Sequence, residues 1–297
     1  MTFAIGLFYL TSGVPIWFAL RANRDRPLLI AVVWGILAWI CWGIVIVLAA
    51  LFSIGVELYA PRQVALAMTG CVGVAVLGAR RPGVGAWNFV VVSLFFVLML
   101  PMLQSWLLSP ESELSDKMWD VFVIAPWALL VLDYLPTNLA LAALSLAAGC
   151  SVETYCVFQR TTSNAPSVGW LFLAAAPWVG WIAWLLEKPT ESEFDRLWLD
   201  FRNRYGFVWA QRSREQFNRS AENNQWPVSL AWHGLQTLEG NKPPDNPQKD
   251  AMLQALRGVL KRFLPERQTD KGDLRVEEQE SRSKTAEGAS EEKIKRR

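Results

Sequence analysis

Seven long apolar stretches fill the first 187 residues of this 297-residue chain, and they constrain the fold more than any other feature. Residues 1–187 carry 8 Lys/Arg and 9 Asp/Glu, whereas the remaining 110 residues carry 21 and 18. No charge appears between Arg26 and Glu57, and about 20 apolar residues are enough to cross a bilayer as a helix. Backbone in lipid must satisfy its own hydrogen bonds, so each crossing is helical. The sequence predicts an all-α integral membrane protein with a charged tail.

The expected architecture is a polytopic transmembrane bundle of about seven helices. We place the spans at about 3–20, 28–54, 62–79, 86–108, 119–135, 138–158 and 167–186. The first contains Pro15 and the fifth contains Asp120, so the topology depends most on these two crossings. The predicted domains are a transmembrane helical domain, a cytoplasmic helical tail and a disordered charged C-terminus, over 1–187, 188–264 and 265–297. The last segment holds 18 charges and almost no large apolar groups, so it cannot form a core.

Positive charge in short loops sets the orientation of a membrane protein. It gathers in the first and third connections and after the last span, at Arg21, Arg24, Arg26, Arg80, Arg81 and Lys188. The loops on the opposite side hold one basic residue each, namely Arg62, Lys117 and Arg160. This bias predicts an outside N-terminus and a cytoplasmic C-terminus.

Glu153 is the ionisable side chain deepest within a predicted span. A charge inside a membrane is costly and is by default a functional hypothesis. Three interpretations stay open: an ion or proton path, a soft-metal site shared with Cys150 one turn away, or a neutral or snorkelling carboxyl. Glu57, Asp120 and Asp133 lie at span ends, where we expect ordinary interfacial solvation.

Three tryptophans, Trp34, Trp39 and Trp42, lie deep in the second span. On a helix they fall within an arc of about 140°. Such an arc indicates a seam packed against other helices or, alternatively, a face that stacks on a ligand.

The segment after the last span predicts an amphipathic helix over about residues 190–222. Thr190 and Glu193 have the spacing of a capping box, which starts a helix. The apolar side chains form one stripe about 120° wide, made of Phe194, Leu197, Trp198, Phe201, Tyr205, Val208 and Trp209. The pattern fades after Trp209, so we expect a turn or bend between Ala210 and Asn223.

This stripe has three candidate destinations: the protein's own bundle or tail, a lipid surface, or a partner protein. Nearby arginines favour phosphate, because a guanidinium binds it with two hydrogen bonds. We assign a membrane-surface or partner-binding role to nine residues, namely Phe194, Leu197, Trp198, Phe201, Arg202, Arg204, Tyr205, Val208 and Trp209.

Two more elements are predicted further along the tail. Residues 226–232 alternate as an extended segment, but no second strand is visible, so we predict no sheet. Asn246 and Pro247 resemble a helix cap and a first-turn proline. The helix that follows ends at Pro265 and has an apolar face of Met252, Leu253, Leu256, Val259, Leu260 and Phe263. His233, the single histidine, has no nucleophile or carboxylate constellation and is expected to be structural or exposed.

The run from Leu197 to Trp209, followed by Gln216, Phe217 and Asn218, resembles a segment of uncharacterised bacterial multipass membrane proteins. The resemblance is confined to the juxtamembrane segment. It implies no activity. Separately, we expect the chain to be an integral protein of a bacterial inner (cell) membrane.

The sequence lacks the common catalytic motifs, including H-E-x-x-H, G-x-S-x-G, a phosphate loop and a redox C-x-x-C. We therefore expect no catalytic residues, no metal and no cofactor, and we do not predict an enzyme. The tail's net charge of +3 is too weak to indicate nucleic acid binding. The expected partners are membrane lipid and a protein bound through the tail.

The leading hypothesis is a non-catalytic membrane protein whose cytoplasmic amphipathic helices organise lipid or partner proteins. The alternative is a transporter or channel component that uses Glu153 and kinked spans. Prolines within the spans support this alternative, because broken helices occur at transporter binding sites. They are Pro15, Pro101, Pro126 and Pro177.

Overall fold

The computed structural model describes residues 2–51, 58–80, 84–107, 116–159, 167–187, 190, 192–238 and 245–264. The described chain is mostly helical, which confirms the all-α prediction. The predicted disordered segment, 265–297, lies outside the described residues.

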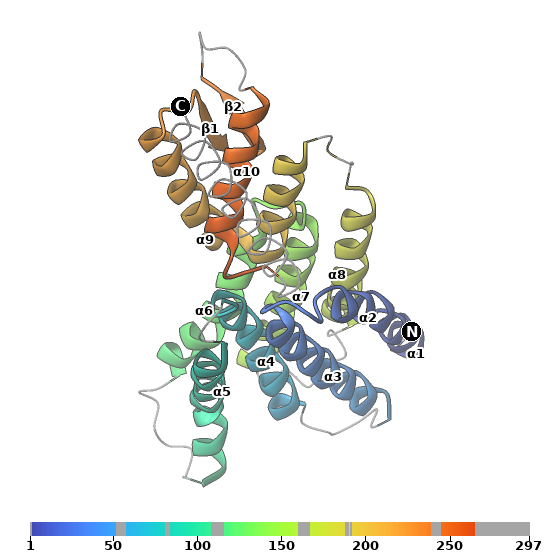
Figure 1. The fold of residues 1–297 in the computed structure, drawn as a ribbon. Helices are drawn as coiled ribbons and strands as arrows, with labels where there is room; N and C mark the ends of the chain where they lie inside the picture. The colour runs from blue at the N-terminus through green and yellow to red at the C-terminus, as the bar shows by residue number, and fades with distance from the viewer. Residues whose placement is uncertain are drawn as a thin grey trace, which may run out of the picture.

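Within the described part of residues 2–187, eight helices form a bundle (Figure 1). They are α1 (Thr2–Thr11), α2 (Gly13–Ala22), α3 (Leu29–Leu51), α4 (Tyr59–Leu77), α5 (Val84–Leu107), α6 (Asp116–Tyr134), α7 (Ala140–Phe158) and α8 (Ser167–Leu185). Among the described residues, five stretches are long and apolar enough to cross a membrane: α1 with α2 as one stretch, α3, α4, α7 and α8. Shorter apolar stretches in the same described ranges lie in α5 and α6. These membrane-length stretches fit a membrane protein.

The first predicted span is broken into two helices at Ser12. The Ser12 hydroxyl turns back and donates to the Tyr9 carbonyl, and it also accepts from the Trp39 indole of α3. Pro15 lies in the first turn of α2, where its missing N–H costs no helical hydrogen bond. The break therefore lies before the proline and is held by a contact with α3.

Helix α4 is the most buried of the five membrane-length stretches and packs on α3, α5, α6 and α7. Small residues allow this close packing, since membrane helices associate through small side chains. A Cβ at Gly70 would lie 2.8 Å from Pro126 Cβ of α6, and one at Gly73 would lie 2.9 Å from Leu130 Cβ. Glycine is thus required where α4 crosses α6.

The tryptophans of α3 contact three different neighbours. Trp34 donates its indole N–H to Asn88 of α5, and Trp42 donates to Thr69 of α4. Trp39 stacks on Tyr9 of α1, with ring centroids 5.7 Å apart. The predicted seam is therefore a packing surface along α3.

The rest of the described chain is a small tail unit lying against one end of the bundle (Figure 1). It consists of α9 (Glu193–Asn223), the strands β1 (Val228–Ala231) and β2 (Gly234–Thr237), and α10 (Asn246–Leu260). The strands pair antiparallel, with Ala231 opposite Gly234. No sheet was expected from the sequence, and the exposed turn between the strands contains His233.

Both predicted helix starts in the tail are wrong by one or two residues. The side chain of Ser192, not Thr190, caps α9 by accepting from the Asp195 amide. Asp245, not Asn246, caps α10 by accepting from the Gln248 amide. Glu193, which was expected to reach back to the cap, instead pairs with Arg257 of α10, with a nitrogen–oxygen distance of 2.6 Å.

The expected bend in the juxtamembrane helix is also misplaced. It lies at Gly206, before Trp209, where φ is +76° and ψ is −172°. This conformation is essentially confined to glycine. Beyond it the buried face takes a new register through Ala210, Ser213, Phe217 and Ala221, which explains why the stripe faded in the sequence.

Candidate functional site

The apolar stripe of α9 faces the interior of the protein. Five of its members are buried: Phe194, Trp198, Phe201, Tyr205 and Trp209. Leu197 and Val208 are half-buried. Around them lie side chains of α10, the hairpin and the bundle, including Met252, Leu256, Leu260, Phe263, Val228, Leu230, Leu28 and Ala31. Of the three destinations, the described contacts are with the protein's own bundle and tail.

The two arginines assigned to this surface are likewise engaged within the chain. Arg202 is buried, and its guanidinium donates to the carbonyl of Trp232 at 2.8 Å and to Asn203 at 2.9 Å. It also donates to Asn138, in the connection after α6, at 3.2 Å. Burial lowers the pKa of the Arg202 guanidinium, and the nearby Glu187 carboxylate raises it.

Asp133, near the end of α6, holds the bend in α9. Its carboxylate accepts from the Val208 amide at 2.8 Å. A Cβ on Gly206 would lie 2.1 Å from an Asp133 oxygen, so only glycine lets the carboxylate approach. Asp133 was expected to be solvated at a span end, but only 4% of it is exposed. That expectation was wrong, because the backbone of α9 replaces water around the carboxylate.

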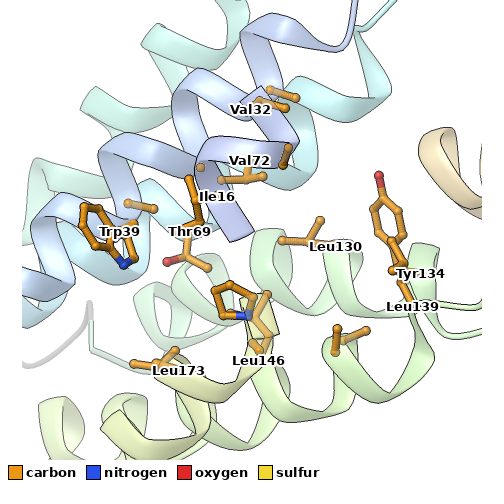
Figure 2. A pocket seen from close by; sticks show the side chains of 18 of the residues that line it. Ile16, Val32, Trp39, Thr69, Val72, Leu130, Tyr134, Leu139, Leu146 and Leu173 are labelled. Atoms are coloured by element: carbon orange, nitrogen blue, oxygen red, sulfur yellow. The ribbon is translucent and has the colours of Figure 1, made fainter. Parts of the chain in front are cut away.

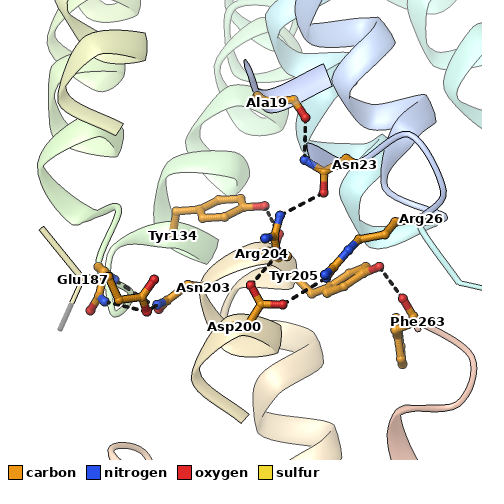
Figure 3. A network of polar contacts seen from close by, with 11 residues as sticks. Ala19, Asn23, Arg26, Tyr134, Glu187, Asp200, Asn203, Arg204, Tyr205 and Phe263 are labelled. Atoms are coloured by element: carbon orange, nitrogen blue, oxygen red, sulfur yellow. Dashed lines mark hydrogen bonds and ion pairs between the residues drawn. The ribbon is translucent and has the colours of Figure 1, made fainter. Parts of the chain in front are cut away.

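A polar network joins α9 to the connection between α2 and α3 (Figure 3). Asp200 accepts from Arg26 at 3.0 Å and from Arg204 at 2.6 Å. Arg204 also donates to the side chain of Asn23 at 3.2 Å, and Tyr134 donates its hydroxyl to the Arg204 carbonyl at 2.6 Å. Charged and polar groups of this connection and of α9 therefore pair with one another where the tail meets the bundle.

Two indoles extend the contact to the chain after α4 and to the connection between α6 and α7. Trp209 donates to the Leu77 carbonyl at the end of α4 at 3.2 Å, and the Arg80 guanidinium lies 5.1 Å from its ring centroid. Trp232 of the hairpin turn donates to the Pro136 carbonyl after α6. Arg80, one of the basic residues used to orient the chain, thus contacts the tail directly.

These contacts define a docking interface, made of Asn23, Arg26, Asp133, Tyr134, Asp200, Arg202, Arg204, Gly206, Val208 and Trp209. Residues from three connections also contact the tail here: Arg26 between α2 and α3, Arg80 between α4 and α5, and Pro136 with Asn138 between α6 and α7. Positive charge in the sequence assigned the first two of these connections to one side of the membrane, and the alternation of the predicted spans assigned the third to the same side. The interface brings them to one end of the bundle.

A second candidate site is a buried ion pair near the opposite end. Arg62 Nε of α4 lies 3.3 Å from Glu153 Oε2 of α7, and the two side chains are 4% and 0% exposed. The expectation that Arg62 lies in a loop was wrong, because it belongs to the first turn of α4. Glu153 precedes the end of α7 by five residues, or about 7.5 Å of helix. The pair therefore lies one to two turns inside the bundle.

The surroundings of Glu153 are tightly packed. A Cβ on Gly169 of α8 would lie 2.7 Å from its carboxylate, so the glycine makes room for it. Besides Arg62, the Trp170 side chain of α8 is a polar neighbour of the carboxylate. Cys150 is also buried, one turn away. Within the described ranges, no cluster of three His, Cys, Asp or Glu side chains is placed to hold a metal.

The ion pair was missed because its two members are 91 positions apart in the sequence. The available signal was that opposite charges stand near the start of one span and near the end of another, on the same predicted side. Gly206 was missed because a single glycine inside an apolar stripe is usually tolerated in a helix. The signal there was the change of register after it.

Comparison with known proteins identifies no relative. The likeness to uncharacterised bacterial membrane proteins therefore stays a resemblance in one segment. No protein-family model, no curated protein and no solved structure matches this chain.

Proposed function

We propose that this is a non-catalytic multipass protein of a bacterial inner membrane, with about seven spans and a cytoplasmic tail that organises a partner protein. The docking interface is the observation that carries the proposal. A tail that served only as a tether would need no fixed position, whereas this one contacts three separate connections of the bundle. Fixed placement is what presentation of a binding surface to another protein requires.

Burial of the stripe favours a partner protein over a lipid surface for the tail. Its large aromatic side chains are already packed against the tail's own core, so they cannot also enter the headgroup region. The exposed part of the tail includes Leu238 at the end of β2, with 48% of its surface accessible, and charged residues such as Arg212 and Arg219. A mixed polar surface of this kind is typical of protein–protein contacts.

Photocrosslinking in native membranes tests the proposal. A photoreactive amino acid at Leu238 should give one discrete protein adduct in the full-length chain. The same probe combined with Asp133→Ala should lose most of the adduct, because the tail is no longer held in position. A probe at Ile182, an exposed apolar side chain of α8, serves as the matched control and should label lipid. Lipid adducts at Leu238, or no adduct at all, would overturn the partner proposal.

The buried ion pair supports a second candidate, a transporter or channel component in which Glu153 carries a proton or ion. A fully buried ionisable group between membrane-length helices is the observation in its favour. Wild-type protein in liposomes with an internal pH dye should then dissipate a proton gradient. Glu153→Gln should abolish this flux, and Arg62→Gln/Glu153→Gln keeps the test valid if the single variant is unstable. Absence of flux with the wild-type protein would eliminate this candidate.

A further inference from the structure

A cavity of about 360 Å³ lies inside the bundle, away from the Arg62–Glu153 pair. Figure 2 shows Val32 of α3 and Val72 of α4 on one side of it, and Leu146 of α7 and Leu173 of α8 on the other. Residues of α1, α2 and α6 also line it. Representative lining residues are Ile16, Val32, Gly35, Leu130, Leu146 and Leu173. Tyr134 marks the end nearest the docking interface.

The polar groups that line the cavity are already paired. The Tyr9 hydroxyl donates to the Trp39 carbonyl at 2.6 Å, and the Trp42 indole donates to Thr69 at 3.1 Å. The Tyr134 hydroxyl points away to Arg204. A space without available polar partners is unfavourable for water and favourable for hydrocarbon. The lining therefore favours an apolar ligand over water.

The volume suits such an occupant. Ligand pockets in proteins are about 300–1,000 Å³ in size, and a dry apolar cavity of about 150 Å³ already binds benzene in another protein. Several lining residues, including Ile16, Val32 and Ala142, are only half-buried. The cavity therefore opens at the bundle surface, where acyl chains surround membrane-length helices.

Positive charge next to the cavity, between Ala19 and Leu28, favours a ligand with an anionic headgroup. Ala19 and Leu28 line the cavity, and the loop between them carries Arg21, Arg24, Asp25 and Arg26, a net charge of +2. Arg21 and Arg24 are exposed, whereas Arg26 is held by Asp200. Juxtamembrane arginines attract anionic lipid and can bind phosphate with two hydrogen bonds.

We propose that this cavity binds one acyl chain of an anionic membrane phospholipid, whose phosphate lies at Arg21 and Arg24. The proposal requires the bundle to lie in a membrane but does not depend on a partner for the tail. It assigns to the bundle a specific lipid site distinct from the general solvation of its outer surface.

Gly35 offers a direct way to block the site. It lines the cavity, and a Cβ built on it has no atom within 4 Å, so a side chain can start there without displacing a neighbour. Gly85, in the first turn of α5, is equally open at its Cβ but does not line the cavity. Gly85→Phe therefore serves as the control for Gly35→Phe, because it adds the same side chain outside the cavity.

Native mass spectrometry of the delipidated full-length protein tests the proposal with three probes: palmitoyl-oleoyl phosphatidylglycerol, the corresponding phosphatidylcholine, and oleate. We expect the wild-type and Gly85→Phe proteins to bind one phosphatidylglycerol at least 10-fold more tightly than Gly35→Phe. Arg21→Gln/Arg24→Gln should lose the preference over phosphatidylcholine. Circular dichroism should show equal helix content in all variants.

Two results would overturn the proposal. Equal phosphatidylglycerol binding by folded Gly35→Phe would place the lipid outside the cavity. Binding of oleate in preference to either phospholipid would identify a free fatty acid as the occupant instead.

Discussion

The carboxylate of Asp133 accepts a hydrogen bond from the backbone amide of Val208, 75 positions later in the chain and 2.8 Å away. The first amides of a helix have no partner within it, and here the helix that restarts after Gly206 receives its cap from another helix. Side-chain oxygens at a helix start stabilise it through both the hydrogen bond and the helix dipole. A side chain of the bundle therefore caps the second half of the tail helix α9.

Gly206→Ala should destabilise the docked tail. The new Cβ would meet an Asp133 oxygen, and an L side chain at φ +76° is strained. Such strain costs about 1–3 kcal/mol. The measurement is the thermal midpoint in detergent, with limited proteolysis of the tail. Gly258→Ala in α10, where a Cβ meets nothing within 4 Å, is the control and should leave both unchanged or improved. Equal proteolysis of the two variants would contradict the interpretation of the bend.

Asp133→Ala should remove the cap and cost about 0.5–2 kcal/mol. It should also relieve part of the penalty of Gly206→Ala, because the clash is with the Asp133 carboxylate itself. The double variant should therefore be more stable than the sum of the single effects predicts. A double-mutant cycle on the free energy of unfolding measures this coupling. Strict additivity would show that the two residues do not act on each other.

For the Arg62–Glu153 pair, single changes should lower the stability of the protein more than the double change does. Arg62→Leu or Glu153→Leu leaves a buried charge without its partner and should cost about 3–5 kcal/mol. Arg62→Leu/Glu153→Leu should recover most of that loss, since a buried pair often contributes little net stability. Thermal unfolding of the three variants in detergent compares them. A double variant as unstable as either single one would mean that the pair contributes more than mutual neutralisation.

Gly73→Ala should disturb the contact between α4 and α6. The added Cβ would lie 2.9 Å from Leu130 Cβ and 3.0 Å from the Pro126 carbonyl oxygen. Overpacking of this kind costs about 1–3 kcal/mol. Gly43→Ala of α3 is the matched control, because its Cβ would make an ordinary 3.6 Å contact with Tyr9. The midpoint of thermal unfolding should fall for the first variant and remain nearly constant for the second.

The proposed orientation predicts which positions an impermeant maleimide can reach in spheroplasts. A cysteine in place of Ser163, between α7 and α8, should react from outside. A cysteine in place of Gly258, exposed on α10, should react only after permeabilisation. The native cysteines Cys71, Cys150 and Cys156 are buried and Cys41 is half-buried, so background labelling should be low. Reaction of Gly258→Cys in intact spheroplasts would show that the tail lies outside and would contradict the proposed topology.

Helices with a strong apolar pattern could be predicted from the sequence. The uncharged run around Trp39 gave α3, and the aromatic stripe from Phe194 to Tyr205 gave the first half of α9. Both follow from periodicity within one segment. The burial of the stripe could not be predicted in the same way, because the same periodicity serves lipid, partner and core.

What remained hidden from the sequence depends on contacts between distant segments. Arg62 and Glu153 satisfy each other across two helices, and neither local pattern reveals the other. Likewise the hairpin is fixed by Asp195 of α9, which accepts from the Leu235 amide at 2.8 Å. A short two-stranded ribbon is marginal by itself, so its sequence carries little signal without the helix beneath it.

The cap supplied by Asp133 also follows the direction of synthesis. The ribosome releases α6 before α9, so the carboxylate is already present in the nascent chain when the second half of α9 emerges. A polypeptide beginning after Glu187 would lack the carboxylate on which its longest helix restarts.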